Sequence, residues 1–191
     1  MPTLTILWFA YDNISAKNAA QISNHIINDL IVESMSMVDI INELEIERGL
    51  SIAYSDSLDL TSSSIKQQRL KVDEAIYSYQ QILAQKSKHL PELSSEYKFR
   101  KKQISSQVED LSIIRKNHKK KAENIFETYS LLIESILTTI QGLQTKTTDV
   151  KITSLLNSFS ILLWIQELTA QERGRLFNAF SKGTIEAGLS Y

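Results

Sequence analysis

The sequence of 191 residues contains no cysteine, only two prolines and only five glycines. Without cysteine, neither a disulfide framework nor a cysteine-ligated metal site is available. Because proline and glycine interrupt regular structure, their scarcity predicts long elements joined by few loops. Hydrophobic residues make up 42% of the chain and charged residues 23%, which is typical of a folded domain rather than a disordered segment.

The chain also lacks the signals of most enzymes and of nucleic-acid-binding proteins. It contains no glycine-rich phosphate loop, no nucleophile motif and no Glu-x-x-His pair, and His25, His89 and His118 are far apart in polar surroundings. The formal net charge is −1, so no overall field favours nucleic acid. We interpret the basic stretch from Lys98 to Lys121 as a solvated helix pair with its turn, rather than a nucleic-acid or lipid-headgroup patch. We therefore expect no enzymatic activity, no cofactor and no metal.

No run of about 20 apolar residues is present, so we expect no complete transmembrane helix. The apolar segment Leu4–Tyr11 has no basic start and no cleavage site, which argues against a signal peptide. Its aromatic residues precede polar Asp12, as at the interfacial end of a membrane helix. An ordinary buried helix start is the other interpretation, and the sequence leaves both open.

The spacing of the apolar residues predicts five helices and no strand. The first extends from about Asn13 to Ser55, either unbroken or as two helices joined near Ser34–Ser36. The others span about 64–88, 91–117, 122–143 and 150 to Gly183 or beyond. Short connections favour an all-α fold, an elongated antiparallel bundle of about five helices with long first and last helices. The fifth helix is the most apolar, so we expect it to be the central one.

One tripeptide, Glu-Arg-Gly, occurs twice, as Glu47–Gly49 and as Glu172–Gly174, each time inside a predicted helix. A glycine inside a helix costs about 1 kcal/mol relative to alanine. Close approach of another backbone would explain that cost. We therefore hypothesise that the first and last helices meet at these two glycines.

Helical phase places both neighbouring arginines on the packed side of their helices. Arg48 lies on the stripe that contains Leu44, and Arg173 lies on the stripe that contains Leu176. Arg175 shares its face with polar residues and is expected to be solvated.

Two interpretations of a packed Arg48 and Arg173 remain open. The arginines either pair with glutamates across the helix seam or clamp a small planar oxyanion. Such an anion matches a guanidinium, which is always charged and donates two parallel hydrogen bonds. Arg69 also lies among apolar residues, but Asp73 is four residues later and is expected to neutralise it.

Five segments in sequence order resemble the NIT domain, the nitrate- and nitrite-sensing domain of bacterial receptors. They are Glu47–Ser51, Gln68–Arg69 with Asp73, Leu111–Arg115, Tyr129 with 131–137, and Leu163–Phe180 with Glu167 and Gln171–Gly174. The similarity covers roughly residues 37–183, although the polar segment between Arg69 and Arg115 departs from the family pattern.

The resemblance implies an all-helical sensor module that binds nitrate or nitrite and regulates an attached output domain. It implies that Arg48 and Arg173 are the anion ligands and that Arg115 is a further recurrent arginine. Arg69 and Ser51, which belong to the resembling segments, complete the expected ligand-binding set.

The implied organisation is a helical stalk over 1–33, near the membrane, followed by a sensor domain over 34–191. We expect the extracytoplasmic, periplasmic domain of an inner-membrane receptor, homodimeric and anchored in the membrane, with nitrate or nitrite bound between the first and last helices and no nucleic-acid partner. If Arg48 and Arg173 lie level, about 20 further residues would separate Tyr191 from a second membrane span. The alternative is a structural or partner-binding bundle that dimerises through its first helix and has no small ligand.

Overall fold

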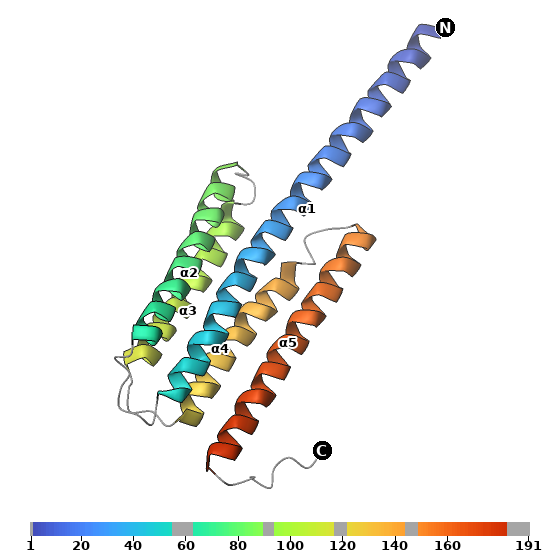
Figure 1. The fold of residues 1–191 in the computed structure, drawn as a ribbon. Coiled ribbons are helices and arrows are strands. Elements are labelled where there is room, and N and C mark those ends of the chain that lie inside the picture. Colours follow the sequence, from blue (N-terminus) through green and yellow to red (C-terminus); the bar gives the residue numbers. More distant parts are fainter. Residues whose placement is uncertain (1, 55–62, 90–93, 117–121, 144–148, 183–191) are drawn as a thin grey trace.

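The computed structural model describes residues 2–54, 63–89, 94–116, 122–143 and 149–182. Five helices cover these ranges: α1 (Pro2–Ala53), α2 (Ser63–His89), α3 (Ser94–Lys116), α4 (Ala122–Leu143) and α5 (Val150–Lys182). No strand occurs in the described ranges, which confirms the all-α prediction. Successive helices run in opposite directions, so α1 and α5 are parallel (Figure 1).

Helix α1 is continuous, and the possible break near Ser34–Ser36 does not occur. The two serines fit inside the helix because their hydroxyl groups donate back to main-chain carbonyls. Ser34 Oγ donates to Leu30 O at 2.8 Å, and Ser36 Oγ donates to Glu33 O at 2.9 Å. Helix α5 begins after Asp149, whose carboxylate accepts a hydrogen bond from the amide of Lys151 at 2.9 Å, as an N-cap does.

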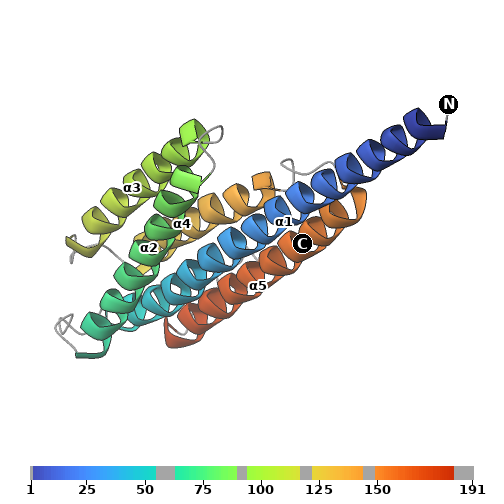
Figure 2. The ribbon, with the colours of Figure 1, turned by 90° about the horizontal axis from the view of Figure 1, so that it is seen from above.

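Helix α1, rather than α5, is the central helix. Helices α2 and α4 both pack against α1, α3 packs against α2 and α4, and α5 lies on the opposite side of α1 from α2 and α3 (Figures 1 and 2). The prediction that α5 is central was wrong because hydrophobicity along a helix does not report which sides are covered. Leu155, Leu162 and Ile165 of α5 are all more than half exposed.

The hydrophobic core is built mainly from α1, α2, α3 and α4. Its largest fully buried apolar side chains are Ile40, Ile41, Leu44, Ile65, Tyr79, Leu83, Leu111, Tyr129, Ile133 and Leu137. Among the described side chains, α5 adds only Leu163 to the buried cluster. The side chain of Phe159 packs against that cluster and is partly exposed. Helix α5 is therefore attached to the bundle along a narrow strip.

The first half of α1 projects beyond the other helices (Figure 1). Across the described ranges, no helix combines the length and apolar character needed to cross a membrane. The side chains of residues 2–26 lie outside the described part of the structure, so the interpretation of Leu4–Tyr11 stays a prediction. His118 and the side chains of His25, His89, Phe177 and Phe180 also lie outside it.

Candidate functional site

Arg48 lies on the packed side of α1, as predicted, and is only 3% exposed. Its guanidinium forms a two-pronged ion pair with Glu167 of α5, with Nη1–Oε1 at 2.5 Å and Nη2–Oε2 at 3.0 Å. Nη1 also donates to Ser130 Oγ of α4 at 2.8 Å. The guanidinium carbon lies 5.2 Å from the ring centroid of Phe126, within range of a cation–π interaction. One arginine thus joins α1, α4 and α5.

Glu167 is fully buried, and further polar groups surround it. Gln171 Nε2 donates to Glu167 Oε1 at 2.8 Å and to Glu134 Oε1 at 3.1 Å. Glu45 of α1 lies nearby. Burial raises the pKa of the Glu45 carboxyl, a hydrogen bond from Gln166 opposes that rise, and the charge of Glu167 adds to it. The seam between α1 and α5 therefore holds one buried cation and several carboxylates.

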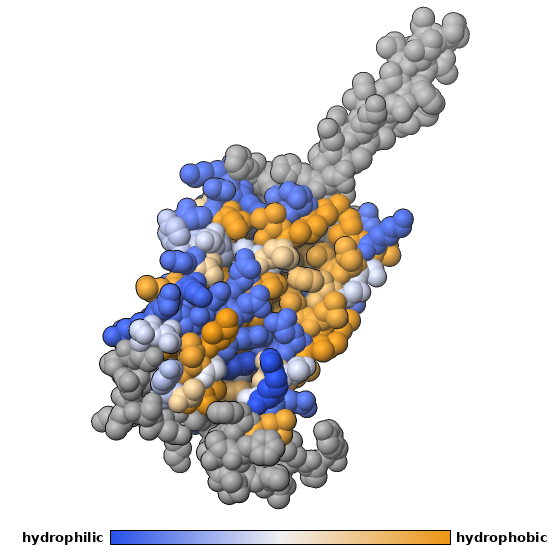
Figure 3. Space-filling view, viewed as in Figure 1, coloured by the Kyte–Doolittle hydropathy of each residue, from blue (hydrophilic) through white to orange (hydrophobic). Residues whose placement is uncertain are grey.

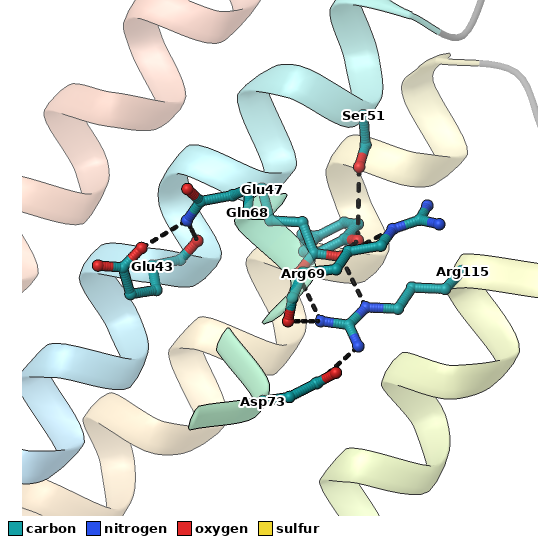
Figure 4. A network of polar contacts seen from close by, with 8 residues as sticks. Glu43, Glu47, Ser51, Gln68, Arg69, Asp73 and Arg115 are labelled. Atoms are coloured by element: carbon teal, nitrogen blue, oxygen red, sulfur yellow. Dashed lines mark hydrogen bonds and ion pairs between the residues drawn. The ribbon is translucent and has the colours of Figure 1, made fainter. Parts of the chain in front are cut away.

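A second network surrounds Glu47, which is fully buried on the side of α1 that faces α2 and α3 (Figure 4). Arg115 of α3 grips this carboxylate, with Nε–Oε1 and Nη2–Oε2 both at 2.7 Å. Tyr129 of α4 donates to Oε1 at 2.7 Å. Burial alone lowers the pKa of Arg115, but the hydrogen bonds and charge of Glu47 outweigh it and raise the pKa. Burial, followed by the Glu47 charge, raises the pKa of Tyr129.

Arg69 and Ser51 lie at the edge of this Glu47 network. Arg69 Nε is 3.5 Å from Glu47 Oε1 and has no hydrogen-bond partner, the single such case among buried side-chain N and O atoms in the described residues. The expected pairing of Arg69 with Asp73 does not occur, because Asp73 Oδ1 accepts from Arg115 Nη1 at 2.7 Å. Ser51 is buried, and its hydroxyl lies 3.5 Å from that of Tyr129.

Arg173 does not point toward the core: it lies on the exposed side of α5. The prediction was wrong because the stripe used to phase it faces outward. Ile165 is 54% exposed and Leu176 is 47% exposed, so apolar periodicity does not identify the packed side of this helix. Arg175 is exposed, as predicted.

The two glycines do not meet, which corrects the hypothesis of a glycine contact between α1 and α5. Gly49 is exposed, and a Cβ added there would have no neighbour within 4 Å. Gly174 does have a packing role, because a Cβ there would lie 2.6 Å from Cε2 of Phe126. That ring lies beneath the Arg48 guanidinium, so Gly174 lets α5 approach α4 beside the Arg48–Glu167 pair.

Sequence reasoning missed a buried cluster around Glu33, two turns of α1 beyond the projecting segment. Glu33 is 1% exposed and pairs with Arg100 Nη1 of α3, and its Oε2 lies 3.7 Å from Lys86 Nζ of α2. Tyr79 OH donates to Glu33 Oε1 at 3.3 Å. Arg100 is buried, which corrects the interpretation of its basic stretch as wholly solvated. The phase test applied to Arg48 would have found Glu33, since Leu30 and Met37 share its face.

The environment of the Glu33 cluster changes the titration of its members. Burial lowers the pKa of Lys86, although the charges of Glu33 and Asp29 oppose this. Burial, followed by the Glu33 charge, raises the pKa of Tyr97 to about 12. A cavity beside Arg100, lined also by Gln103, has a volume of about 10 Å³, room for one water molecule. A three-oxygen anion would have to push the helices apart to enter it.

Comparison with known proteins supports one family. A family model described as nitrate and nitrite sensing (NIT) matches residues 39–190, which is most of the chain. Neither the curated proteins nor the solved structures contain a significant match.

Proposed function

The chain belongs to the NIT family of nitrate- and nitrite-sensing domains, and from this premise we propose that it binds nitrate or nitrite at Arg48. The domain then serves as the sensor of a signal-transduction receptor. One observation carries the proposal: the buried Arg48 guanidinium holds the two oxygens of a planar carboxylate edge-on. Nitrate and nitrite each present the same pair of oxygens to such a fork.

The surroundings of Arg48 suit a small anion. Water is largely excluded, so each charge-assisted hydrogen bond is stronger than it would be at the surface. Ser130 Oγ accepts a hydrogen bond from Nη1 at 2.8 Å, which leaves the proton of this hydroxyl as a further donor at the edge of the fork. Phe126 covers one side of the guanidinium plane. A ligand wider than a few atoms would have to displace this ring.

Nitrate must replace Glu167, because this carboxylate occupies both prongs of the fork. Glu167 pairs with no cation other than Arg48 among the described residues, and a buried carboxylate that loses its cationic partner is unstable by several kcal/mol. Glu167 therefore has to leave the seam when the anion enters. Since Glu167 belongs to α5, which has a narrow attachment to the core, its departure shifts α5 relative to α1. We propose that this shift is the signal passed to an output domain.

The other expected ligand residues take different parts in the proposal. Arg115 and Arg69 bind the carboxylate of Glu47, which fixes the rotation of α1 about its axis. In this rotation the neighbouring Arg48 points toward α5. Ser51 supports the same arrangement through Tyr129. Arg173, which the family resemblance makes a second ligand, would reach the anion only after α5 turns. The proposal therefore assigns Arg173 to the anion-bound state alone.

We further propose that the domain lies on the outer side of an inner membrane, that α1 leads toward that membrane, and that the receptor is a homodimer. The projecting first half of α1 supports this orientation (Figure 1). A continuous helix of this kind would connect the sensor to the bilayer. Crosslinking and protease accessibility of the chain in intact cells would test the placement.

Titration calorimetry with nitrate, nitrite and chloride tests ligand binding directly. We expect heat from nitrate or nitrite and loss of that heat in Arg48→Lys, which keeps the charge without the fork. Arg175→Ala, which removes an exposed arginine of α5, should change nothing. Arg48→Ala could fail to fold because it leaves Glu167 unpaired, so Arg48→Ala with Glu167→Gln serves as the second variant. Absence of heat from both oxyanions would refute the proposal.

Arg173→Ala tests whether Arg173 contributes to anion binding, which we expect only after α5 has turned. If Arg173 joins the anion only after α5 turns, its loss weakens binding while the ion pair between Arg48 and Glu167 survives in the free protein. Unchanged affinity in Arg173→Ala would remove this residue from the site.

One observation favours a second function, a structural or partner-binding bundle without a small ligand. Arg48, Arg100 and Arg115 each already have a carboxylate partner within the described residues. The charges of these three arginines are therefore balanced without an added anion. The calorimetric test decides between the two functions, because only a sensor releases heat with nitrate or nitrite.

A further inference from the structure

Helix α5 reverses the usual distribution of side chains between surface and interior. Its exposed surface is largely apolar (Figure 3), with Leu162 and Ile165 both more than half exposed. Its inward side carries polar groups instead, because Ser160, Glu167 and Gln171 are all buried. Their spacing places these three residues on one side of the helix. Buried polar side chains need hydrogen-bonding partners, so the contacts of this side show what it can bind.

Gln171 completes a set of three N–H donors around one carboxylate. Oε1 of Glu167 accepts hydrogen bonds from Arg48 Nη1 at 2.5 Å and from Gln171 Nε2 at 2.8 Å. Oε2 accepts from Arg48 Nη2 at 3.0 Å. The arginine belongs to α1 and the glutamine to α5. An anion that takes the place of this carboxylate would therefore meet the glutamine donor as well as the guanidinium fork.

Glu134 of α4 keeps the amide of Gln171 turned toward the fork. The amide nitrogen carries two N–H groups, and the second donates to Glu134 Oε1 at 3.1 Å. A flipped amide would point its carbonyl oxygen at two carboxylates and would be repelled by both. Because Glu134 does not belong to α5, it holds the nitrogen in this orientation when Glu167 leaves. The donor is thus preset for the incoming anion.

We propose that Gln171 is a ligand residue of the anion site and that its amide donates to the nitrate or nitrite oxygen beside Nη1 of Arg48. The proposal rests on anion binding at Arg48 and adds an uncharged donor to that site. The oxyanion would then contact three helices, through Arg48 of α1, Ser130 of α4 and Gln171 of α5. The helix that releases its carboxylate would stay bound to the anion that replaces it.

A neutral amide suits this exchange. A second cation at this position would bind Glu167 more tightly and hinder its release. Gln171 can donate equally well to the carboxylate and to the oxyanion, so its own hydrogen bond is kept when one replaces the other. An empty fork, by contrast, would leave a buried N–H of Gln171 without a partner, which costs free energy. Gln171 therefore favours replacement of Glu167 over its simple departure.

Titration calorimetry of the whole chain with nitrate tests this role in two backgrounds. In Glu167→Ala the fork has no competing carboxylate, so Gln171→Leu removes a donor from the anion-bound state alone. We expect nitrate to bind at least about 10-fold more weakly, because a hydrogen bond to a charged group is lost. In the natural chain the same substitution removes the donor from the free and the bound state alike, so the affinity should change little.

Gln166→Leu in the Glu167→Ala background is the matched control. Gln166 is an exposed glutamine of α5 that donates to Asn42 and Glu45 rather than to Glu167. We expect it to leave the nitrate affinity unchanged. Equal affinity losses from Gln171→Leu and Gln166→Leu would overturn the role of Gln171. So would a nitrate affinity in Glu167→Ala that does not fall when Gln171 is replaced.

Glu167→Gln gives a second background if Glu167→Ala proves too unstable, since it removes the charge but keeps the volume of the side chain. The same loss of nitrate affinity on Gln171→Leu is expected there. Circular dichroism in the presence of nitrate checks that each variant is folded. If neither background binds nitrate or nitrite, anion binding at Arg48 is wrong, and the role of Gln171 fails with it. If both bind and Gln171→Leu has no effect, only the role of Gln171 is wrong.

Discussion

The two ends of the packed part of α1 use the same residue types in opposite ways. At the Glu33 end, α1 supplies a buried carboxylate, and α2 and α3 supply Lys86 and Arg100. At the Arg48 end, α1 supplies the buried cation, and the peripheral helix α5 supplies Glu167. The first arrangement surrounds a fixed anion with cations.

From this difference we infer which end exchanges its carboxylate partner for a dissolved anion. A nitrate ion that entered the Glu33 cluster would be repelled by the carboxylate of Glu33, which belongs to the central helix α1. At the Arg48 end it would meet a guanidinium, and its competitor belongs to the least embedded helix. Because α5 contributes only Leu163 to the buried cluster of described side chains, we expect the second end to release its carboxylate with less disruption of the core. We therefore expect Glu33 to maintain stability and Glu167 to regulate access to Arg48.

The largest expected effect comes from removing the carboxylate at each end. Glu167→Ala leaves the buried Arg48 without a carboxylate partner and should lower the free energy of unfolding by about 3–5 kcal/mol. Glu33→Ala should also destabilise the protein strongly, although Arg100 keeps its pair with Glu96 and Lys86 keeps its pair with Asp29. Added nitrate should restore stability to Glu167→Ala, because the anion takes the vacant fork, but not to Glu33→Ala. Urea denaturation with and without nitrate measures both. If nitrate restored the stability of both variants equally, the proposed difference between the two ends of α1 would be wrong.

The two glycines should respond to alanine in opposite directions. Gly174→Ala places a methyl group against Phe126 and should cost about 1–3 kcal/mol through overpacking. Gly49→Ala meets open space and should stabilise α1 by roughly 0.5–1 kcal/mol. Thermal unfolding of the two variants measures the contrast. Relief of the Gly174→Ala penalty by Phe126→Leu would identify the ring as its cause.

A smaller effect is expected from the exposed partner of Arg115. The side chain of Asp73 is 53% exposed, whereas that of Glu47 is fully buried, although both accept hydrogen bonds from the same guanidinium. Solvent screening should limit the cost of Asp73→Ala to about 0.2–1 kcal/mol. Urea denaturation at low and high salt checks this value. A loss as large as that of Glu47→Ala would mean that Asp73 acts as part of the buried network.

The smallest effect concerns pH at the Arg48 end. Burial raises the pKa of Glu45 above its ordinary value of 4.5, so the folded protein binds this proton more tightly than the unfolded chain does. The stability from Glu45 is therefore present below pH 4.5 and is lost as the pH rises through the folded pKa. Glu45→Gln should remove this fall from the pH profile of the melting temperature. An unchanged profile would place the titration elsewhere.

The fold was largely predictable because the chain has so few helix breakers. Helix α4 begins and ends at the expected residues, and α2 and α5 begin within about one residue of them. Arg48 was also placed correctly, since its neighbours Ile41 and Leu44 are buried. Arg173 was not, because both sides of α5 are apolar. The same property concealed that α1, rather than α5, is the central helix.

By itself the sequence determined the helical class, the absence of enzyme motifs, the family and the burial of Arg48, since each rests on local pattern. Only the tertiary structure decided that Arg48 meets Glu167, that Glu47 meets Arg115, and that Glu33 has its own cluster. Ion pairing across a bundle depends on which helices are neighbours and how each is rotated. Helical periodicity gives a direction on one helix, but it does not identify the helix that lies in that direction.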